Sequence, residues 1–309
     1  MSNSPLQSYI VSPSAADPAL RGSPSSLIPI SAAWFLPNAG TTGHASFLKS
    51  HIPNSRFFDL DAISDTSSPY PHMLPNASTF SSHIGRLGIS HYDHLLIYDA
   101  PESGLFSAPR VAWTFRVFGH KGGVHILNNY KTWVEEGLSS ISGEQEQFKS
   151  KTYEAQEPDR SMVVQYETVR DIARKNFWEG ADAAQALVLD ARSRGRWEGA
   201  DPEPRKGLSS GHVPGSVSLP FTEMLDEKKR LKGKEELRKL FEDRGIAGDR
   251  EMITSCGTGV TASVLEAALK EVGLAEGKRR VYDGSWTEYA QRSDSIEGLI
   301  EKTGLVQSG

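Results

Sequence analysis

The sequence predicts an α/β protein of two similar domains, each a parallel sheet flanked by helices. Three observations predict it: a weak repeat that runs in order along the chain, short apolar stretches that alternate with helix-like runs, and a polar stretch between the two copies. At 309 residues the chain has room for about two domains. Its 38% hydrophobic and 24% charged residues are ordinary for a globular protein.

The repeat is visible in three matched features. His-Ile-Pro-Asn-Ser at 51–55 returns as His-Val-Pro-Gly-Ser at 212–216, an offset of 161 residues. The apolar stretch that ends beside Asp99 and its helix-like run match the stretch that ends beside Cys256, at an offset of 157. Trp133 and Trp286 follow at an offset of 153. Slowly shrinking offsets indicate small deletions between two copies of one domain.

The elements of each copy follow from apolar patterning. Short strands are expected within 94–99 and 124–127 in the first copy, and within 187–189, 251–256 and 280–283 in the second, with helices between them. Such alternation is typical of a parallel sheet covered on both faces. We predict a first domain over 1–140, a linker over 141–160, which is polar and lacks apolar periodicity, and a second domain over 161–309.

Composition excludes several classes of protein. One cysteine excludes an intramolecular disulfide and an all-cysteine metal site, and it favours the cytosol, with a mitochondrial pool as the alternative. A net charge of −5 argues against a surface that coats nucleic acid, and no apolar run of about 18 residues is present to span a membrane. No cofactor or metal is expected, because neither a His/Cys ligand cluster nor a G-x-G-x-x-G loop after a strand is apparent.

Cys256 is a candidate nucleophile. It stands in Ser-Cys-Gly-Thr-Gly-Val-Thr, between an apolar strand and a helix-like run that begins near Thr261. Gly257 and Gly259 allow a tight loop whose N–H groups point inward, and the helix adds the positive end of its dipole, so a thiolate or bound anion is stabilised. The alternative is a small buried hydrophobe. Asp99 occupies the equivalent position in the first copy, so only the second domain can carry thiol chemistry.

The chain closely resembles the tandem-rhodanese sulfurtransferases, and within them the 3-mercaptopyruvate sulfurtransferases. The motifs are Ser-Pro-Tyr-Pro-His-Met-Leu-Pro at 68–75, Phe-Ser-Ala-Pro-Arg at 106–110 and Glu-Pro-Arg at 203–205, and the similarity runs from Tyr9 to Glu288. The resemblance implies two rhodanese domains, an inactive first copy and a persulfide on the loop cysteine. The loop is similar to the mercaptopyruvate type, whereas two basic residues follow the cysteine in the thiosulfate type.

Charge also favours a donor other than the thiosulfate dianion, because Gly257 and Thr258 are neutral. By resemblance, Arg196 and Arg205 bind the carboxylate and carbonyl of mercaptopyruvate. The alternative is that these arginines are solvated or pair with nearby acids, and we expect a structural role for their neighbours Arg192 and Arg194. The residues expected to bind the donor are Arg196, Arg205, Gly257, Gly259, Val260 and Thr261.

A proton relay is also implied by the resemblance, and its positions here are Thr258, His72 and Asp61. A threonine keeps the hydroxyl of the family's serine and adds a methyl group. The alternatives are an interface role for His72 and a capping or salt-bridge role for Asp61. Asp283 and Trp286 are expected to be structural, at the base of the cysteine loop.

Three other functions are compatible with parts of this pattern. A rhodanese-related phosphatase would need an arginine six residues after the cysteine, where Ala262 stands, so this class is excluded. A thiosulfate:cyanide sulfurtransferase and a non-catalytic sulfur-relay or binding module remain as alternatives. Because there is no second cysteine, the acceptor must be an outside thiol such as thioredoxin, glutathione or a rhodanese-like carrier protein, or cyanide in vitro. Similarity to fungal members linked to tRNA thiolation favours a protein acceptor over direct tRNA binding.

Overall fold

The computed structural model describes residues 4–22, 27–144, 147–181, 183–293, 296 and 298–303. The chain forms two compact units, each described by itself below. The first comprises Met1–Ser67, Leu74–Asp159 and Leu225–Leu231, and the second comprises Ser68–Met73, Arg160–Met224 and Lys232–Gly309. The segment Ser68–Met73 therefore belongs to the second unit although the chain around it belongs to the first. The outer limits of the predicted domains, residues 1 and 309, lie outside the described residues.

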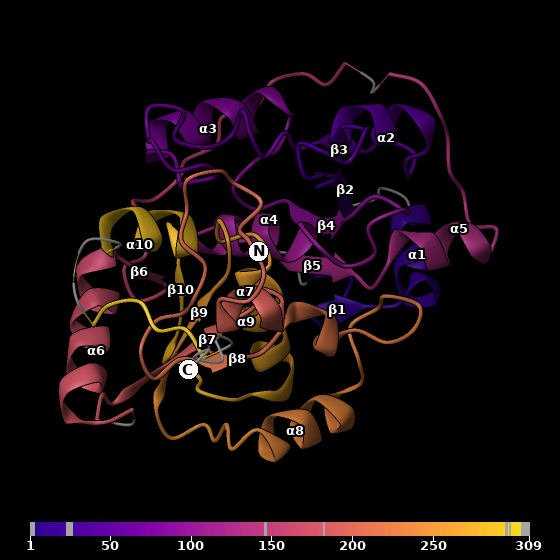
Figure 1. Cartoon of the computed structure of the whole chain (residues 1–309). Helices are drawn as coiled ribbons and strands as arrows, with labels where there is room; N and C mark the ends of the chain where they lie inside the picture. The colour runs from indigo at the N-terminus through magenta and orange to yellow at the C-terminus, as the bar shows by residue number, and fades with distance from the viewer. Residues whose placement is uncertain are drawn as a thin grey trace. The chain divides into compact units, whose positions relative to one another are not determined.

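The first unit is a five-stranded parallel sheet in the order β1-β5-β4-β2-β3 (Figure 1). Its strands are β1 (Ile10–Val11), β2 (Leu27–Ser31), β3 (Arg56–Phe57), β4 (His94–Tyr98) and β5 (Val124–Leu127). Its helices are α1 (Pro13–Arg21), α2 (Gly43–Lys49), α3 (Ala77–Arg86), α4 (Ala108–Val117) and α5 (Tyr130–Glu135). Every residue of β2 and β4 is buried, as expected for strands covered on both faces.

The second unit repeats this plan, with a parallel sheet in the order β6-β10-β9-β7-β8 (Figure 1). Its strands are β6 (Val163–Val164), β7 (Ala186–Asp190), β8 (Val217–Ser218), β9 (Glu251–Ser255) and β10 (Arg279–Tyr282). Its helices are α6 (Tyr166–Glu179), α7 (Arg194–Glu198), α8 (Lys234–Asp243), α9 (Ala262–Val272) and α10 (Ser285–Ser293), with a 3₁₀ turn η1 (Phe221–Met224). The two strand orders are the same when matched in sequence order. The prediction of two tandem domains with parallel sheets flanked by helices is confirmed.

The repeated His-x-Pro motif has the same structural role in both units. His51 forms an antiparallel bridge with Ile141, and His212 forms one with Glu301. The His51 ring stacks on Phe47 at 4.0 Å between ring centroids, and the His212 ring stacks on Trp197 at 3.7 Å. In each case Nδ1 of the histidine is hydrogen-bonded to the carbonyl of the residue on which the ring stacks. In each copy the motif thus holds the histidine against a later segment of the chain through an antiparallel bridge.

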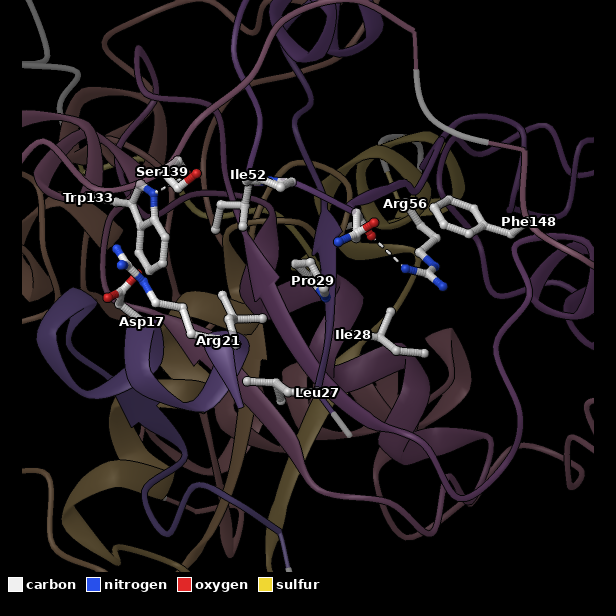
Figure 2. Close-up of a pocket in the computed structure, with 13 residues that line it drawn as sticks. Asp17, Arg21, Leu27, Ile28, Pro29, Ile52, Arg56, Trp133, Ser139 and Phe148 are labelled. Carbon is white, nitrogen blue, oxygen red and sulfur yellow. Dashed lines mark hydrogen bonds and ion pairs between the residues drawn. The ribbon is translucent and has the colours of Figure 1, made fainter. Parts of the chain in front are cut away.

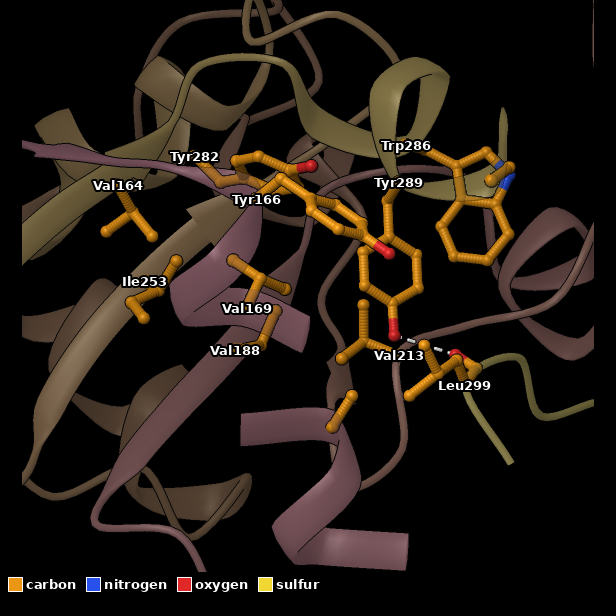
Figure 3. Packing of buried hydrophobic residues seen from close by; sticks show 12 residues of the cluster. Val164, Tyr166, Val169, Val188, Val213, Ile253, Tyr282, Trp286, Tyr289 and Leu299 are labelled. Atoms are coloured by element: carbon orange, nitrogen blue, oxygen red, sulfur yellow. Dashed lines mark hydrogen bonds between the residues drawn. The ribbon is translucent and has the colours of Figure 1, made fainter. Parts of the chain in front are cut away.

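One face of the second sheet is covered by α6 and α10 and carries a cluster rich in aromatic side chains (Figure 3). Val188 of β7 and Ile253 of β9 point into it, whereas their strand neighbours point to the other face because side chains alternate along a strand. The Tyr289 hydroxyl donates a hydrogen bond of 2.7 Å to the Leu299 carbonyl, so its polar end is satisfied inside the cluster. This packing fixes α10 against the sheet next to the cysteine loop.

Helix α9 is buried along most of its length, including its small residues Ala262, Ala267 and Ala268. A helix that is apolar on nearly all sides is expected in the interior of a domain. Its C-terminal cap is Gly273, in the left-handed conformation at φ +75°. The helix therefore holds the end of the cysteine loop in a fixed place.

The described residues of the predicted linker, 141–144 and 147–160, form no helix, and those before Arg160 belong to the first unit. The N–H of Lys151 donates to the Gly85 carbonyl, and the N–H of Gln156 donates to that of Phe118. Tyr153 is buried against Phe80. Among the described residues, no helix has the length and apolar character needed to cross a membrane.

Candidate functional site

Cys256 lies in the loop that joins the end of β9 to the start of α9, as the sequence predicts. It is 2% exposed and is a free thiol. Thr261 is the N-cap of α9. Gly259 has φ +78°, a conformation that favours glycine, so the loop can turn back on itself within a few residues. The sulfur is therefore placed at the carboxyl edge of the sheet, near the positive end of a helix dipole.

The loop turns its carbonyl groups away and leaves N–H groups available. The Cys256 carbonyl accepts from the N–H of Trp286 at 2.9 Å, and the Gly257 carbonyl accepts from both the N–H and the hydroxyl of Thr287. Among the described residues, none accepts a hydrogen bond from the N–H groups of Gly257, Thr258, Val260 or Thr261. Successive N–H groups of this kind form a cradle for an anion or a thiolate.

Ser285 supports the loop from below, a role that the sequence analysis missed. Its hydroxyl accepts from the N–H of Cys256 at 3.1 Å and donates to the Tyr282 carbonyl at 2.8 Å. It is fully buried and has φ +48°, which is unusual for a residue other than glycine. Its only signal in the sequence was its position in Tyr-Asp-Gly-Ser-Trp beside Trp286. Asp283 is buried as well, and Trp286 bonds the loop as described above.

The structure brings Thr258 and His72 together. Oγ1 of Thr258 and Nδ1 of His72 share a hydrogen bond of 3.0 Å, whose direction depends on the histidine tautomer, and both side chains are buried. His72 has φ +63° and belongs to the segment Ser68–Met73 of the second unit. Asp61 lies in the first unit, where both of its carboxylate oxygens accept from Nε1 of Trp34 at 3.1 and 3.2 Å. The contact between Thr258 and His72 is thus present, and the place of Asp61 in a relay stays a prediction.

A buried ion-pair network stands beside the loop. Arg192 binds both oxygens of Asp190, donates 2.7 Å to the Gly211 carbonyl, and lies 3.9 Å from the centroid of the Trp286 ring. Burial alone would lower the pKa of Arg192, but the carboxylates of Asp190 and Glu203 raise it above its ordinary value. Arg192 is therefore structural, as expected.

Arg196 lies next to the cysteine loop. Its Nη2 atom is 3.4 Å from the position that a β-carbon on Gly257 would take. Its Nε and Nη2 atoms donate to Glu203 at 3.1 and 2.5 Å, and its side chain is 21% exposed. Arg196 thus pairs with an acid and also lies beside Gly257, and its binding of the donor stays a prediction. Arg205 is half-buried, and Arg194 is exposed and pairs with Glu198.

The first unit has the same cradle, filled by its own carboxylate. Asp99 follows β4 as Cys256 follows β9, and it is 2% exposed. Its oxygens accept from the N–H groups of Phe106, Ser107 and Ala108 and from the Ser107 hydroxyl, at 2.7 to 2.8 Å. Burial raises the pKa of Asp99 to about 6, although these hydrogen bonds oppose the rise. The position cannot form a persulfide.

A cavity of about 530 Å³ lies in the first unit beside the start of β2 (Figure 2). Its lining includes Trp133, the Arg21 and Asp17 ion pair at 2.9 Å, and Arg56, which stacks on Phe148 at 3.6 Å from the ring centroid. It contains no cysteine, and it lies at the amino edge of the sheet, whereas parallel sheets place their ligands at the carboxyl edge. We assign no sulfur chemistry to it.

Comparison with known proteins agrees with this geometry. A family model described as a rhodanese-like domain matches residues 173–292. A probable 3-mercaptopyruvate sulfurtransferase of Schizosaccharomyces pombe is 40% identical over 273 residues, which are 88% of this chain and 89% of the relative. The thiosulfate sulfurtransferase TUM1 of Saccharomyces cerevisiae is 38% identical over 280 residues, 86% of this chain and 89% of the relative.

A solved structure is similar over nearly the whole chain. It is the sulfur transferase subunit found in sub-stoichiometric amount in yeast mitochondrial complex I, with a TM-score of 0.85 and 33% identity, and the match covers 96% of this chain and all of that one. The cysteine loop, the repeated parallel sheets and these similarities all indicate the same protein family. The chain belongs to the tandem-rhodanese sulfurtransferases, in the family of the 3-mercaptopyruvate sulfurtransferases.

Proposed function

We propose that this enzyme moves sulfur from 3-mercaptopyruvate to a thiol acceptor through a persulfide on Cys256. The observation that carries the proposal is the placement of the chain's one cysteine in a loop of available N–H groups, with Arg196 beside it. A thiolate is the reactive form of cysteine, and such a loop favours it. A non-catalytic binding module would have no need of this arrangement.

In the first step the Cys256 thiolate attacks the sulfur of the donor. A sulfur–sulfur bond forms, the carbon–sulfur bond breaks, and its electron pair passes to the carbon to give the enolate of pyruvate. Arg196 and Arg205 are proposed to bind the donor's carboxylate and carbonyl and to stabilise the enolate charge as it develops. Removing one such donor in other enzymes costs about 3 kcal/mol of transition-state stabilisation. The persulfide is then proposed to rest among the available N–H groups of the loop, those of Gly257, Thr258, Val260 and Thr261.

The enolate must gain a proton to leave as pyruvate. The hydrogen bond between Thr258 and His72 supports a role for this pair in supplying it, because both groups can donate and accept. We propose Asp61 as the third member that orients His72. This last assignment rests on the family resemblance.

The proposed donor is mercaptopyruvate because the loop carries no cation to match a second negative charge. Gly257 and Thr258 follow the cysteine, and neither is charged. Thiosulfate remains the second candidate, since one of the similar proteins is named for it. Steady-state kinetics with both donors, measured side by side, test the choice: the ratio of kcat/KM values should favour mercaptopyruvate.

The second step needs a thiol from another molecule, because Cys256 is the only cysteine. We propose that thioredoxin or a rhodanese-like carrier protein is the physiological acceptor, and that the enzyme contributes to tRNA thiolation through that carrier without binding tRNA. The net charge of −5 supports the absence of direct tRNA binding, because the RNA backbone is itself negatively charged. We place the enzyme in the cytoplasm with a mitochondrial pool. A free thiol suits reducing compartments, and the similar sulfur transferase subunit of yeast complex I is mitochondrial.

The acceptor is tested by following loss of the extra sulfur from persulfidated protein. Reduced thioredoxin should remove it faster than glutathione at equal thiol concentration, and tRNA should show no salt-sensitive binding at micromolar protein. Faster transfer to glutathione, or tRNA binding that weakens steeply with salt, would overturn the acceptor assignment and leave the donor chemistry intact.

A further inference from the structure

Glu203 is a buried acid held between two arginines. Its side chain is 3% exposed. Oε1 accepts from Arg192 at 2.8 Å and from Nε of Arg196 at 3.1 Å, and Oε2 accepts from Nη2 of Arg196 at 2.5 Å. We infer that Glu203 is a positioning residue that sets the charge selectivity of the donor site, an inference that rests on the proposed function.

Glu203 fixes which edge of Arg196 faces the cysteine loop. It occupies the edge formed by Nε and Nη2, and no described residue accepts a hydrogen bond from Nη1. A guanidinium uses either edge for a bidentate carboxylate pair. Because the Nε edge is taken, the edge formed by Nη1 and the outer hydrogen of Nη2 is left for the donor, and Nη2 is the atom that lies beside Gly257.

Glu203 is itself held rigidly. Arg192, its second partner, is anchored by Asp190, by the Gly211 carbonyl and by the face of Trp286. The backbone N–H of Trp286 in turn donates to the Cys256 carbonyl. The position of Arg196 is therefore tied to the loop that holds the nucleophile, through groups that are almost completely buried.

The same contacts cancel charge. Asp190 and Glu203 neutralise Arg192 and Arg196, so this cluster offers hydrogen-bond donors to the substrate without net positive charge. Mercaptopyruvate with a protonated thiol is a monoanion, and thiosulfate is a dianion. A dianion gains more than a monoanion from each positive charge added to a site. Glu203 thus disfavours the dianionic donor.

The test is the rate of persulfide formation on Cys256, measured by mass spectrometry with mercaptopyruvate and with thiosulfate. Glu203→Gln should raise the ratio of the thiosulfate to the mercaptopyruvate rate constant about tenfold, since one negative charge near the donor is lost. Glu203→Asp keeps the charge but withdraws it from Arg196, so it should raise KM for both donors and leave the ratio within about twofold. Glu198→Gln is the matched control: it removes a negative charge nearby from an exposed pair, and the ratio should stay within about twofold.

If Glu203→Gln fails to fold, Arg196→Gln tests the same charge balance with the opposite sign. It leaves Asp190 and Glu203 with Arg192 as their one shared cation, so the cluster gains a net negative charge and the ratio should fall. The inference is overturned if Glu203→Gln is folded and changes the ratio no more than Glu198→Gln, or if Glu203→Asp changes it as much as Glu203→Gln. A wild-type protein that took sulfur from thiosulfate faster than from mercaptopyruvate would overturn the proposed donor and this inference together. If the wild type prefers mercaptopyruvate and Glu203→Gln leaves the ratio of the two rate constants unchanged, the inference about Glu203 is overturned and the proposed function stands.

Discussion

Replacing Thr258 by valine removes one hydroxyl from the site and nearly preserves the side chain's shape. The hydroxyl lies 3.0 Å from Nδ1 of His72, and both residues are buried. Valine fills the same volume and cannot form this hydrogen bond. Thr258→Ser is the matched control, because it keeps the hydroxyl and removes only the methyl group.

Two magnitudes follow from this geometry. A buried hydrogen-bonding group that loses its partner costs about 1 to 3 kcal/mol, so the free energy of unfolding should fall by that amount. General acid–base catalysis contributes about 10² to 10⁴ in rate, so if the pair protonates the enolate, kcat for pyruvate release should fall at least about 10²-fold. The two effects are separable, because a purely structural hydrogen bond would lower stability without slowing the folded enzyme.

The assay combines chemical denaturation with single-turnover measurement of pyruvate release at mercaptopyruvate concentrations above KM. We expect Thr258→Val to be folded, less stable and slow, and Thr258→Ser to keep kcat within a few-fold of the wild type. A folded Thr258→Val enzyme with wild-type kcat would refute a role for the pair in proton transfer. A further test is the double variant with His72→Gln, which should be no slower than the worse single variant if the two residues act as a unit.

Three other perturbations give distinct readouts. Arg196→Ala and Arg205→Ala should each raise KM for mercaptopyruvate and lower kcat, and unchanged kinetics in both would move the carboxylate site elsewhere. Gly257→Arg together with Thr258→Lys should shift the ratio of kcat/KM values toward thiosulfate, and an unmoved ratio would show that these positions do not set donor choice. Because burial raises the pKa of Asp99 to about 6, the native state holds this proton more tightly than the unfolded chain. The protonated Asp99 should therefore add about 2 to 3 kcal/mol to the free energy of unfolding at about pH 4, and this contribution should be lost as the pH rises through about 6. Denaturant unfolding measured as a function of pH checks this, and the pH dependence should be absent in Asp99→Asn.

Local patterns in the sequence predicted the fold and the position of Cys256 in a loop between a strand and a helix. The His-x-Pro repeat at His51 and His212 marks equivalent bridges in the two units. The strand before Asp99 matches the strand before Cys256 because each is the central strand of its own sheet. Glycines around Cys256 predicted the loop, since tight turns need residues without a side chain. Features of this kind are set by residues close together in the chain.

Pairings set by tertiary structure could not be predicted in the same way. Several acids near Arg196 were equally available as partners, and the choice of Glu203 depends on how the chain folds back after α7. Ser285 lies beneath Cys256 because β9 and β10 are neighbours in the sheet, although the two residues are 29 positions apart. His72 reaches Thr258 across 186 positions because Ser68–Met73 belongs to the second unit. No periodicity in the sequence records these contacts.

The central claim is that Cys256 carries the transferred sulfur, and intact-protein mass spectrometry after incubation with mercaptopyruvate tests it most directly. We predict that the wild-type chain gains the mass of one sulfur atom, located at Cys256 by peptide mapping, with release of one pyruvate per chain. The Cys256→Ser protein should fold, gain no sulfur and release no pyruvate. Pyruvate release by folded Cys256→Ser protein, or a wild-type chain that releases pyruvate without gaining sulfur on Cys256, would contradict the account.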